Sequence, residues 1–166
     1  MGYAEFADAA GDAGVDAVLT VDMPPEEVEA FGELLAARDI DNVLLVSPTT
    51  PDSRIQTIVE QARGFIYFVS LKGVTGAGHL DVNAVAEDCA RVRRYWSQPL
   101  AVGFGIKDVP SATAIAAFAD AVVVGSALVD RMGSIDPGVD SASAVSDAAG
   151  LIAQMRAGLD APDKAE

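Results

Sequence analysis

Apolar residues gather in five short runs that recur along the chain, with polar stretches between them. The runs occupy residues 17–22, 42–48, 64–70, 100–106 and 120–126. Each is nearly continuous in apolar residues, as strands that are buried on both faces are. The pattern therefore predicts five buried β-strands.

The polar stretches between these runs have helical spacing. In residues 24–39, the apolar side chains of Val28, Phe31, Leu34 and Leu35 fall on one stripe of a helix. Further helices are predicted over residues 50–63, 81–96 and 108–119, with one before the first strand (2–14) and one after the last (143–159). Strictly alternating strands and helices imply right-handed crossovers and a parallel sheet, so the fold class is α/β.

Two architectures fit this pattern of strands and helices. One is a doubly wound sheet that is complete with five strands, and the other is part of an eight-stranded (β/α)₈ TIM barrel. We expect a single domain over residues 1–166, because the one loose stretch, 133–143, lies before the last helix. The end of the chain, 159–166, is expected to be frayed.

Composition narrows the class of protein. The chain has 166 residues, of which 51% are hydrophobic and 22% charged, so we expect a soluble globular protein. A net charge of −14 would repel a nucleic-acid backbone, and no apolar run is long enough to span a membrane. We expect a cytoplasmic location and no metal site. The single cysteine, Cys89, is predicted to be a core thiol and not a nucleophile.

Glycines mark the carboxyl ends of the last three predicted strands, where both architectures build their sites. They lie in the segments 73–78, 103–105 and 125–127. A short helix is predicted to begin at Gly125 and Ser126, so that its free amide groups and positive dipole end would suit a phosphate. In TIM barrels, the phosphate pocket commonly combines the loops after the last two strands with such a helix. This layout favours the barrel, with the fourth and fifth runs as its seventh and eighth strands.

Four segments in this order resemble a known family: "GVDAVLTVDMPPEE", "IYFVSLKGVTGAG", "VGFGI" and "VVVGSALV". They are similar to the carboxyl-terminal part of the tryptophan synthase alpha chain, and the resemblance covers essentially the whole sequence. It implies a partial TIM barrel that corresponds to strands four to eight. It also implies a lyase of tryptophan biosynthesis, which cleaves indole-3-glycerol phosphate to indole and glyceraldehyde 3-phosphate by a retro-aldol reaction. This reaction uses no cofactor. In the family, pyridoxal phosphate is the cofactor of the partner beta chain.

The resemblance also implies roles for individual residues. The phosphate-binding positions are Gly76, Gly105, Gly125 and Ser126. Tyr67 and Phe104 would line the substrate cavity, and Thr75 would lie in a mobile loop that closes over the site and orients a catalytic carboxylate.

Asp22 and Pro24 match positions at the contact with the beta chain, in an assembly of two alpha and two beta chains. Asp22 could equally cap the following helix. Leu71 occupies a position where some members carry arginine. Lys72 and His79 are expected to be solvated surface residues, and Trp96 is expected to serve packing.

No catalytic residue is carried over to this sequence. The family uses two carboxylates, one on the second strand and one in the loop that follows it. Neither that strand nor that loop has a counterpart here. An unclosed barrel would also expose unpaired strand edges. The sequence begins inside a predicted helix, which fits a fragment, a split gene product or a misassigned start. We therefore expect the phosphate-binding half of the site to be inactive alone.

Two other functions remain open at this point. The first is a self-contained five-stranded module that binds a phosphorylated ligand without turnover. The second is a different barrel enzyme that acts on a sugar phosphate. The "GVTG" segment argues against this second function.

Overall fold

The five predicted strands are present and form one sheet. The computed structural model describes residues 1–21, 23, 25–70, 81–133 and 141–161. The strands are β1 (Ala17–Leu19), β2 (Asp41–Val46), β3 (Ile66–Val69), β4 (Leu100–Gly103) and β5 (Ala121–Val123). Each lies within or close to its predicted run and is shorter than predicted, because pairing stops where the chain turns toward the next helix.

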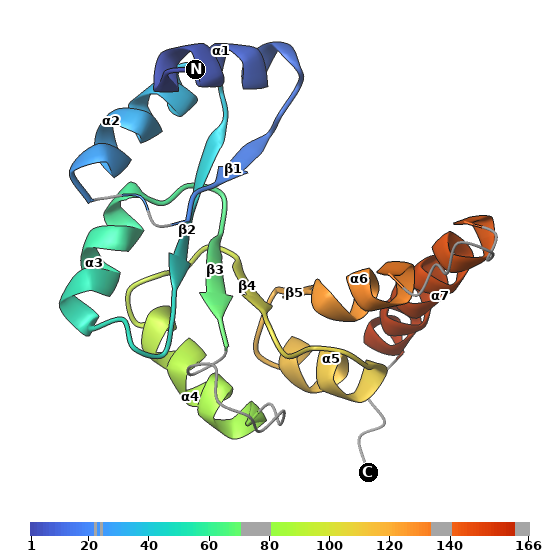
Figure 1. Cartoon of the computed structure of the whole chain (residues 1–166). Helices are drawn as coiled ribbons and strands as arrows, with labels where there is room; N and C mark the ends of the chain where they lie inside the picture. The colour runs from blue at the N-terminus through green and yellow to red at the C-terminus, as the bar shows by residue number, and fades with distance from the viewer. Residues whose placement is uncertain (22, 24, 71–80, 134–140, 162–166) are drawn as a thin grey trace.

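The order of the strands decides between the two architectures. All neighbours are parallel, and the order in the sheet is β1-β2-β3-β4-β5, the order of the sequence (Figure 1). A doubly wound sheet reverses its strand order at a switch point, and this sheet has no reversal. Sequential right-handed crossovers place the helices on one face, which makes the sheet part of a (β/α)₈ barrel. The structure therefore confirms the prediction of a partial barrel.

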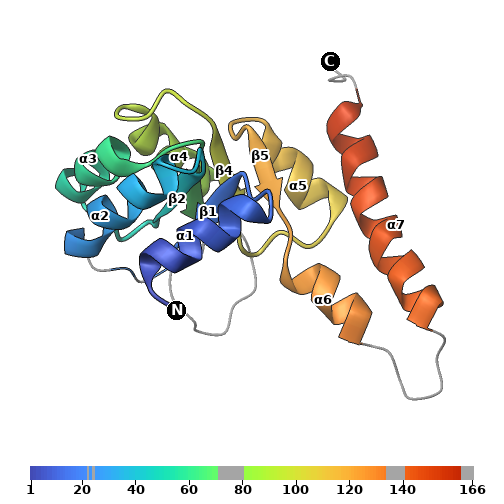
Figure 2. The ribbon, with the colours of Figure 1, turned by 90° about the horizontal axis from the view of Figure 1, so that it is seen from above.

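Helices connect and flank the strands as the sequence predicts. They are α1 (Tyr3–Asp12), α2 (Pro25–Ala36), α3 (Asp52–Gln61), α4 (Val82–Arg93), α5 (Val109–Ala116), α6 (Ser126–Gly133) and α7 (Ser141–Asp160). Asp81 caps α4 by accepting from the Ala84 amide at 3.1 Å, and Asp108 caps α5 by accepting from the Ser111 amide at 2.9 Å. Seen from above, α7 lies beside α5 and α6, with which it packs (Figure 2).

The main core lies between the central strands and their helices. It is built by fully buried side chains such as Ile55, Ile66, Phe68, Leu100 and Ile115. A smaller cluster of Ala7, Ala10, Phe31, Leu35 and Ile40 packs α1 and α2 together beside β1. No helix in the described part of the chain is long and apolar enough to cross a membrane.

Two side chains singled out in the sequence belong to this core. Cys89 and Trp96 are buried in it, which confirms both as packing residues. Burial raises the pKa of the Cys89 thiol to about 12, and the neighbouring Asp88 carboxylate adds to the shift, so the thiol stays protonated and unreactive. The indole N–H of Trp96 donates to the Pro99 carbonyl at 2.9 Å.

The prediction that all five strands are buried on both faces is wrong for the outer two. Every residue of β4 is buried, whereas β1 and β5 contain no buried residue. Each of these two strands has a single neighbour in the sheet, so one side of its backbone and part of its apolar surface face outward. Leu19 is 40% exposed for this reason.

Candidate functional site

The register of the sheet brings three strand ends to the same level. Val69 of β3 lies opposite Gly103 of β4, and Gly103 lies opposite Val123 of β5. The residues that follow these three positions therefore emerge side by side at the carboxyl edge. This is the edge at which α/β barrels carry their active sites.

Ser70 follows β3 and forms hydrogen bonds to the turn that follows β4. Its side-chain hydroxyl lies 2.7 Å from the Gly103 carbonyl and 2.6 Å from the Phe104 carbonyl, so it can donate to either. Its backbone amide also donates to the Gly103 carbonyl at 3.0 Å. Ser70 is 7% exposed and was not singled out by sequence reasoning, since a lone serine at a strand end carries no recognisable signal.

The turn after β4 has an unusual backbone. Phe104 and Gly105 both have positive φ angles, 72° and 77°, in the left-handed region that glycine adopts easily and phenylalanine does not. The conformation costs roughly 1 kcal/mol at Phe104, and the surrounding contacts must supply that energy. Strained backbone of this kind clusters at ligand sites. Phe104 is 52% exposed in this turn.

Tyr67 and Phe104, both predicted to line a cavity, lie against each other. Their ring centroids are 6.4 Å apart and their planes meet at 89°, an edge-to-face arrangement. Tyr67 crosses directly over Gly103, where an added Cβ atom would lie 1.9 Å from the tyrosine oxygen. The absence of a side chain at Gly103 therefore leaves room for Tyr67. From the sequence alone, this role of a glycine could not be distinguished from letting a ligand approach the backbone. Burial raises the pKa of the Tyr67 phenol.

The start of α6 lies at the end of the neighbouring strand. The amides of Leu128 and Val129 donate to the Gly125 carbonyl at 2.9 and 3.1 Å, so the helix is formed from its first turn. Amides in the first turn of a helix have no partner within the helix. Gly125 and Ser126 are exposed, and a Cβ atom added at Gly125 would meet no atom within 4 Å. The predicted short helix is thus confirmed, with open space beside its first residues.

Four of the predicted site residues, Phe104, Gly105, Gly125 and Ser126, therefore follow the carboxyl ends of two adjacent strands, β4 and β5. Tyr67 lies within the neighbouring strand β3, and its ring reaches Gly103 and Phe104. Thr75 and Gly76, with Leu71, Lys72 and His79, lie outside the described residues, as do Asp22 and Pro24. Within the described part of the chain, no group of three or more His, Cys, Asp or Glu side chains could hold a metal ion.

The fold defines a protein of the (β/α)₈-barrel class, and these residues form a candidate site at the carboxyl edge of its strands. Comparison with known proteins makes the assignment specific. The family model "Tryptophan synthase alpha chain" matches residues 1–158. The chain belongs to the tryptophan synthase alpha chain family.

Relatives and solved structures agree with this assignment. The chain is 56% identical to the tryptophan synthase alpha chain of Chromobacterium violaceum over 137 residues, which are 82% of this chain and 52% of the relative. It is 48% identical to the alpha chain of Thiobacillus denitrificans over 99% of this chain and 59% of the relative. The alpha chain structure from Legionella pneumophila subsp. pneumophila matches with a TM-score of 0.82 and 31% identity, over 98% of this chain and 59% of that one.

A chain from the tryptophan synthase a2b2 complex of Pyrococcus furiosus also matches, with a TM-score of 0.79 and 32% identity, over 94% of this chain and 61% of that one. The chain thus spans little more than half the length of the curated relatives it matches.

Proposed function

We propose that this chain supplies the phosphate-binding part of a site that cleaves indole-3-glycerol phosphate to indole and glyceraldehyde 3-phosphate. The family to which the chain belongs catalyses this cleavage. The observation that carries the proposal is the pair of neighbouring strand ends. The left-handed turn at Phe104 and Gly105 follows β4, and the start of α6 follows β5, the neighbour of β4 in the sheet.

These two features suit the ester phosphate of the substrate. Glycine at 105 and at 125 leaves the main-chain amides open to a close approach by phosphate oxygens. The first turn of α6 adds unpartnered N–H groups and the positive end of the helix dipole. Tyr67 and Phe104 offer an aromatic wall beside this place, where the flat indole ring could stack. Thr75 and Gly76 would complete the phosphate site from the segment after β3.

We further propose that residues 1–166 do not perform the cleavage alone. The reaction needs a group that removes the hydroxyl proton and one that protonates the leaving indole carbon. The family's two carboxylates have no counterpart in this sequence, so Asp16, Asp22 and Glu26 are not assigned that role. No cofactor is required of this chain.

The proposed partner is a tryptophan synthase beta chain. Asp22 and Pro24, in the segment between β1 and α2, are the proposed contact residues. The exposed Val21 side chain, which is 62% accessible, adds apolar surface next to them. The structural similarity to a chain from an a2b2 complex supports this partner.

A phosphate-ester binding assay tests the first proposal. Glycerol 3-phosphate titrated into the purified chain should perturb the amide signals of Gly105, Gly125 and Ser126. Gly105→Glu and Ser126→Glu should each abolish this binding, because a carboxylate would occupy the proposed phosphate position and repel the phosphate. Ser97→Glu is the matched control, since it adds the same charge in the turn between α4 and β4, at the opposite edge of the sheet. Equal binding by all three variants would remove these residues from the site.

An activity assay tests the second proposal separately. Indole release from indole-3-glycerol phosphate by the purified chain should be undetectable. Measurable turnover would show that this chain has catalytic groups of its own. Binding of glycerol 3-phosphate without turnover would also fit a phosphate-binding module, the alternative that the sequence left open.

A further inference from the structure

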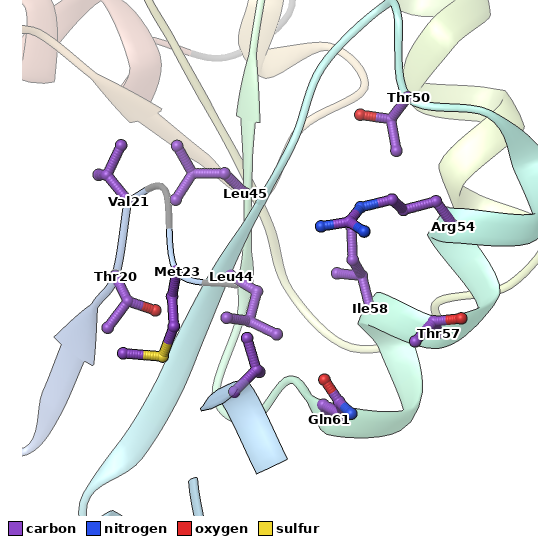
Figure 3. A pocket seen from close by; sticks show the side chains of 11 residues that line it. Thr20, Val21, Met23, Leu44, Leu45, Thr50, Arg54, Thr57, Ile58 and Gln61 are labelled. Carbon is purple, nitrogen blue, oxygen red and sulfur yellow. The ribbon is translucent and has the colours of Figure 1, made fainter. Parts of the chain in front are cut away.

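A cavity lies apart from the residues of the proposed phosphate site, none of which lines it. It has a volume of about 220 Å³ and lies between the ends of β1 and β2 and the helices α2 and α3 (Figure 3). About half of its lining is apolar, with Met23, Val28, Leu44 and Ile58 among these residues, and the polar half consists of Thr20, Thr50, Arg54, Thr57 and Gln61. Its lining comes from β2, α2 and α3 and from residues that follow β1 and β2.

The charge of this cavity is opposite to that of the protein. Among the described residues, its lining contains one charged side chain, Arg54, and no acidic one. Six of the eight arginines are paired with aspartates: Arg38, Arg91, Arg93, Arg94, Arg131 and Arg156. Arg54 and Arg63 have no carboxylate partner in the described part of the chain. Arg54 is exposed, and its guanidinium points into the cavity without a counter-ion among the described residues, so it is available for an anionic ligand.

A second polar group faces the same space. The Thr20 hydroxyl is buried and has no hydrogen-bond partner among the described residues. In Figure 3 the guanidinium of Arg54 enters from α3, and Thr20 lies on the side of β1. Buried polar groups normally have partners, so an unpartnered hydroxyl marks a place where a ligand or a water molecule would be held.

We propose that this cavity binds a small organic carboxylate with an apolar body. The planar guanidinium of Arg54 matches the two oxygens of a carboxylate, and the Thr20 hydroxyl can donate a further hydrogen bond to them. The apolar walls would enclose a short hydrocarbon chain. A phosphate ester fits less well, because it carries the higher charge and Arg54 is the one charged donor among the described lining residues. The proposal does not depend on the phosphate site, since none of the residues assigned there lines this cavity.

The test uses isovalerate as the probe and the full chain at physiological ionic strength, where the repulsion from the net negative charge is screened. Isovalerate should bind saturably, in about the millimolar range that its few atoms permit. The signals of Thr20 and Ile58 should shift in the NMR spectrum. Isovaleramide, the neutral isostere, should bind at least about tenfold more weakly, because it loses the charge-assisted hydrogen bonds.

Two arginine variants separate a local contact from a change in net charge. Arg54→Gln should weaken isovalerate binding about tenfold. Arg63→Gln removes the same charge from the other unpaired arginine, which lines a different cavity, and should leave the affinity within about twofold. Thr20→Val should weaken binding about threefold or more without lowering the unfolding midpoint.

The proposal would be overturned by no saturable binding of isovalerate, by equal binding of isovaleramide, or by equal losses in the two arginine variants. Inorganic phosphate that competes with isovalerate at equal or higher affinity would also overturn it, by showing a general anion site. A circular dichroism spectrum for each variant confirms that the fold is intact.

Discussion

Ser70→Ala should destabilise the protein by loosening the turn that carries Phe104 and Gly105. The substitution removes a hydroxyl that lies within hydrogen-bond distance of two carbonyl oxygens and is 7% exposed. The Gly103 carbonyl keeps the Ser70 amide as a donor at 3.0 Å. The Phe104 carbonyl loses its partner, and the left-handed conformation of Phe104 loses a contact that holds it.

The magnitude follows from these contacts. A hydrogen bond contributes about 0.5–1.5 kcal/mol net, and a buried carbonyl left without a partner costs about 1–3 kcal/mol. Because the Phe104 carbonyl is only partly buried, we expect a loss of about 1–2 kcal/mol in the free energy of unfolding. With a urea m-value of about 2 kcal/mol/M, the midpoint should fall by about 0.5–1 M.

Urea unfolding followed by the fluorescence of the buried Trp96 measures this effect. Hydrogen exchange at the Gly105 amide should also become faster, since the turn opens more readily. Ser97→Ala, at an exposed position between α4 and β4, is the matched control and should change the free energy by less than about 0.5 kcal/mol. If Ser70→Ala unfolds at the same urea concentration as this control, the hydroxyl does not hold the turn.

Three further predictions concern other parts of the fold. Asn42→Val should raise the free energy of unfolding by about 1–2 kcal/mol. The Asn42 side chain is 1% exposed, and both of its polar atoms lack partners in the described part of the chain. A lower free energy of unfolding in urea titrations would show that these atoms are satisfied. Gly103→Ala should cost about 1–3 kcal/mol by displacing the Tyr67 ring, and combining it with Tyr67→Leu should recover part of the loss; equal losses in the single and double variants would contradict this. The Asp120 carboxylate accepts from the Leu100 amide at 2.7 Å and pairs with Arg93, which holds its pKa below the ordinary value of 3.8. Its contribution is therefore complete above about pH 4 and lost as the pH falls through the lowered pKa, so Asp120→Asn should flatten the acid limb of a stability profile, and an unchanged limb would refute this role.

Local pattern was sufficient to predict the helices and strands of this protein and to propose the edge of the sheet for the candidate site. Apolar runs with polar helical stretches between them specify strands and helices, because burial depends on the spacing of side chains along the chain. The glycine-marked strand ends and the short helix at Ser126 were also visible in the sequence. The resemblance carried by four segments indicated the family, which the comparisons confirm.

Contacts between distant residues were decided by the tertiary structure alone. The sequential strand order, which excludes a doubly wound sheet, depends on how five strands pair, and one strand's sequence does not state its neighbours. The same is true of the exposed faces of β1 and β5. The hydroxyl of Ser70 on the Phe104 carbonyl joins residues 34 positions apart. Arg54 and Thr20 share a cavity because β1 and β2 are adjacent and α3 packs beside them. Periodicity records which residues are buried, whereas sites are formed by residues that only folding brings together.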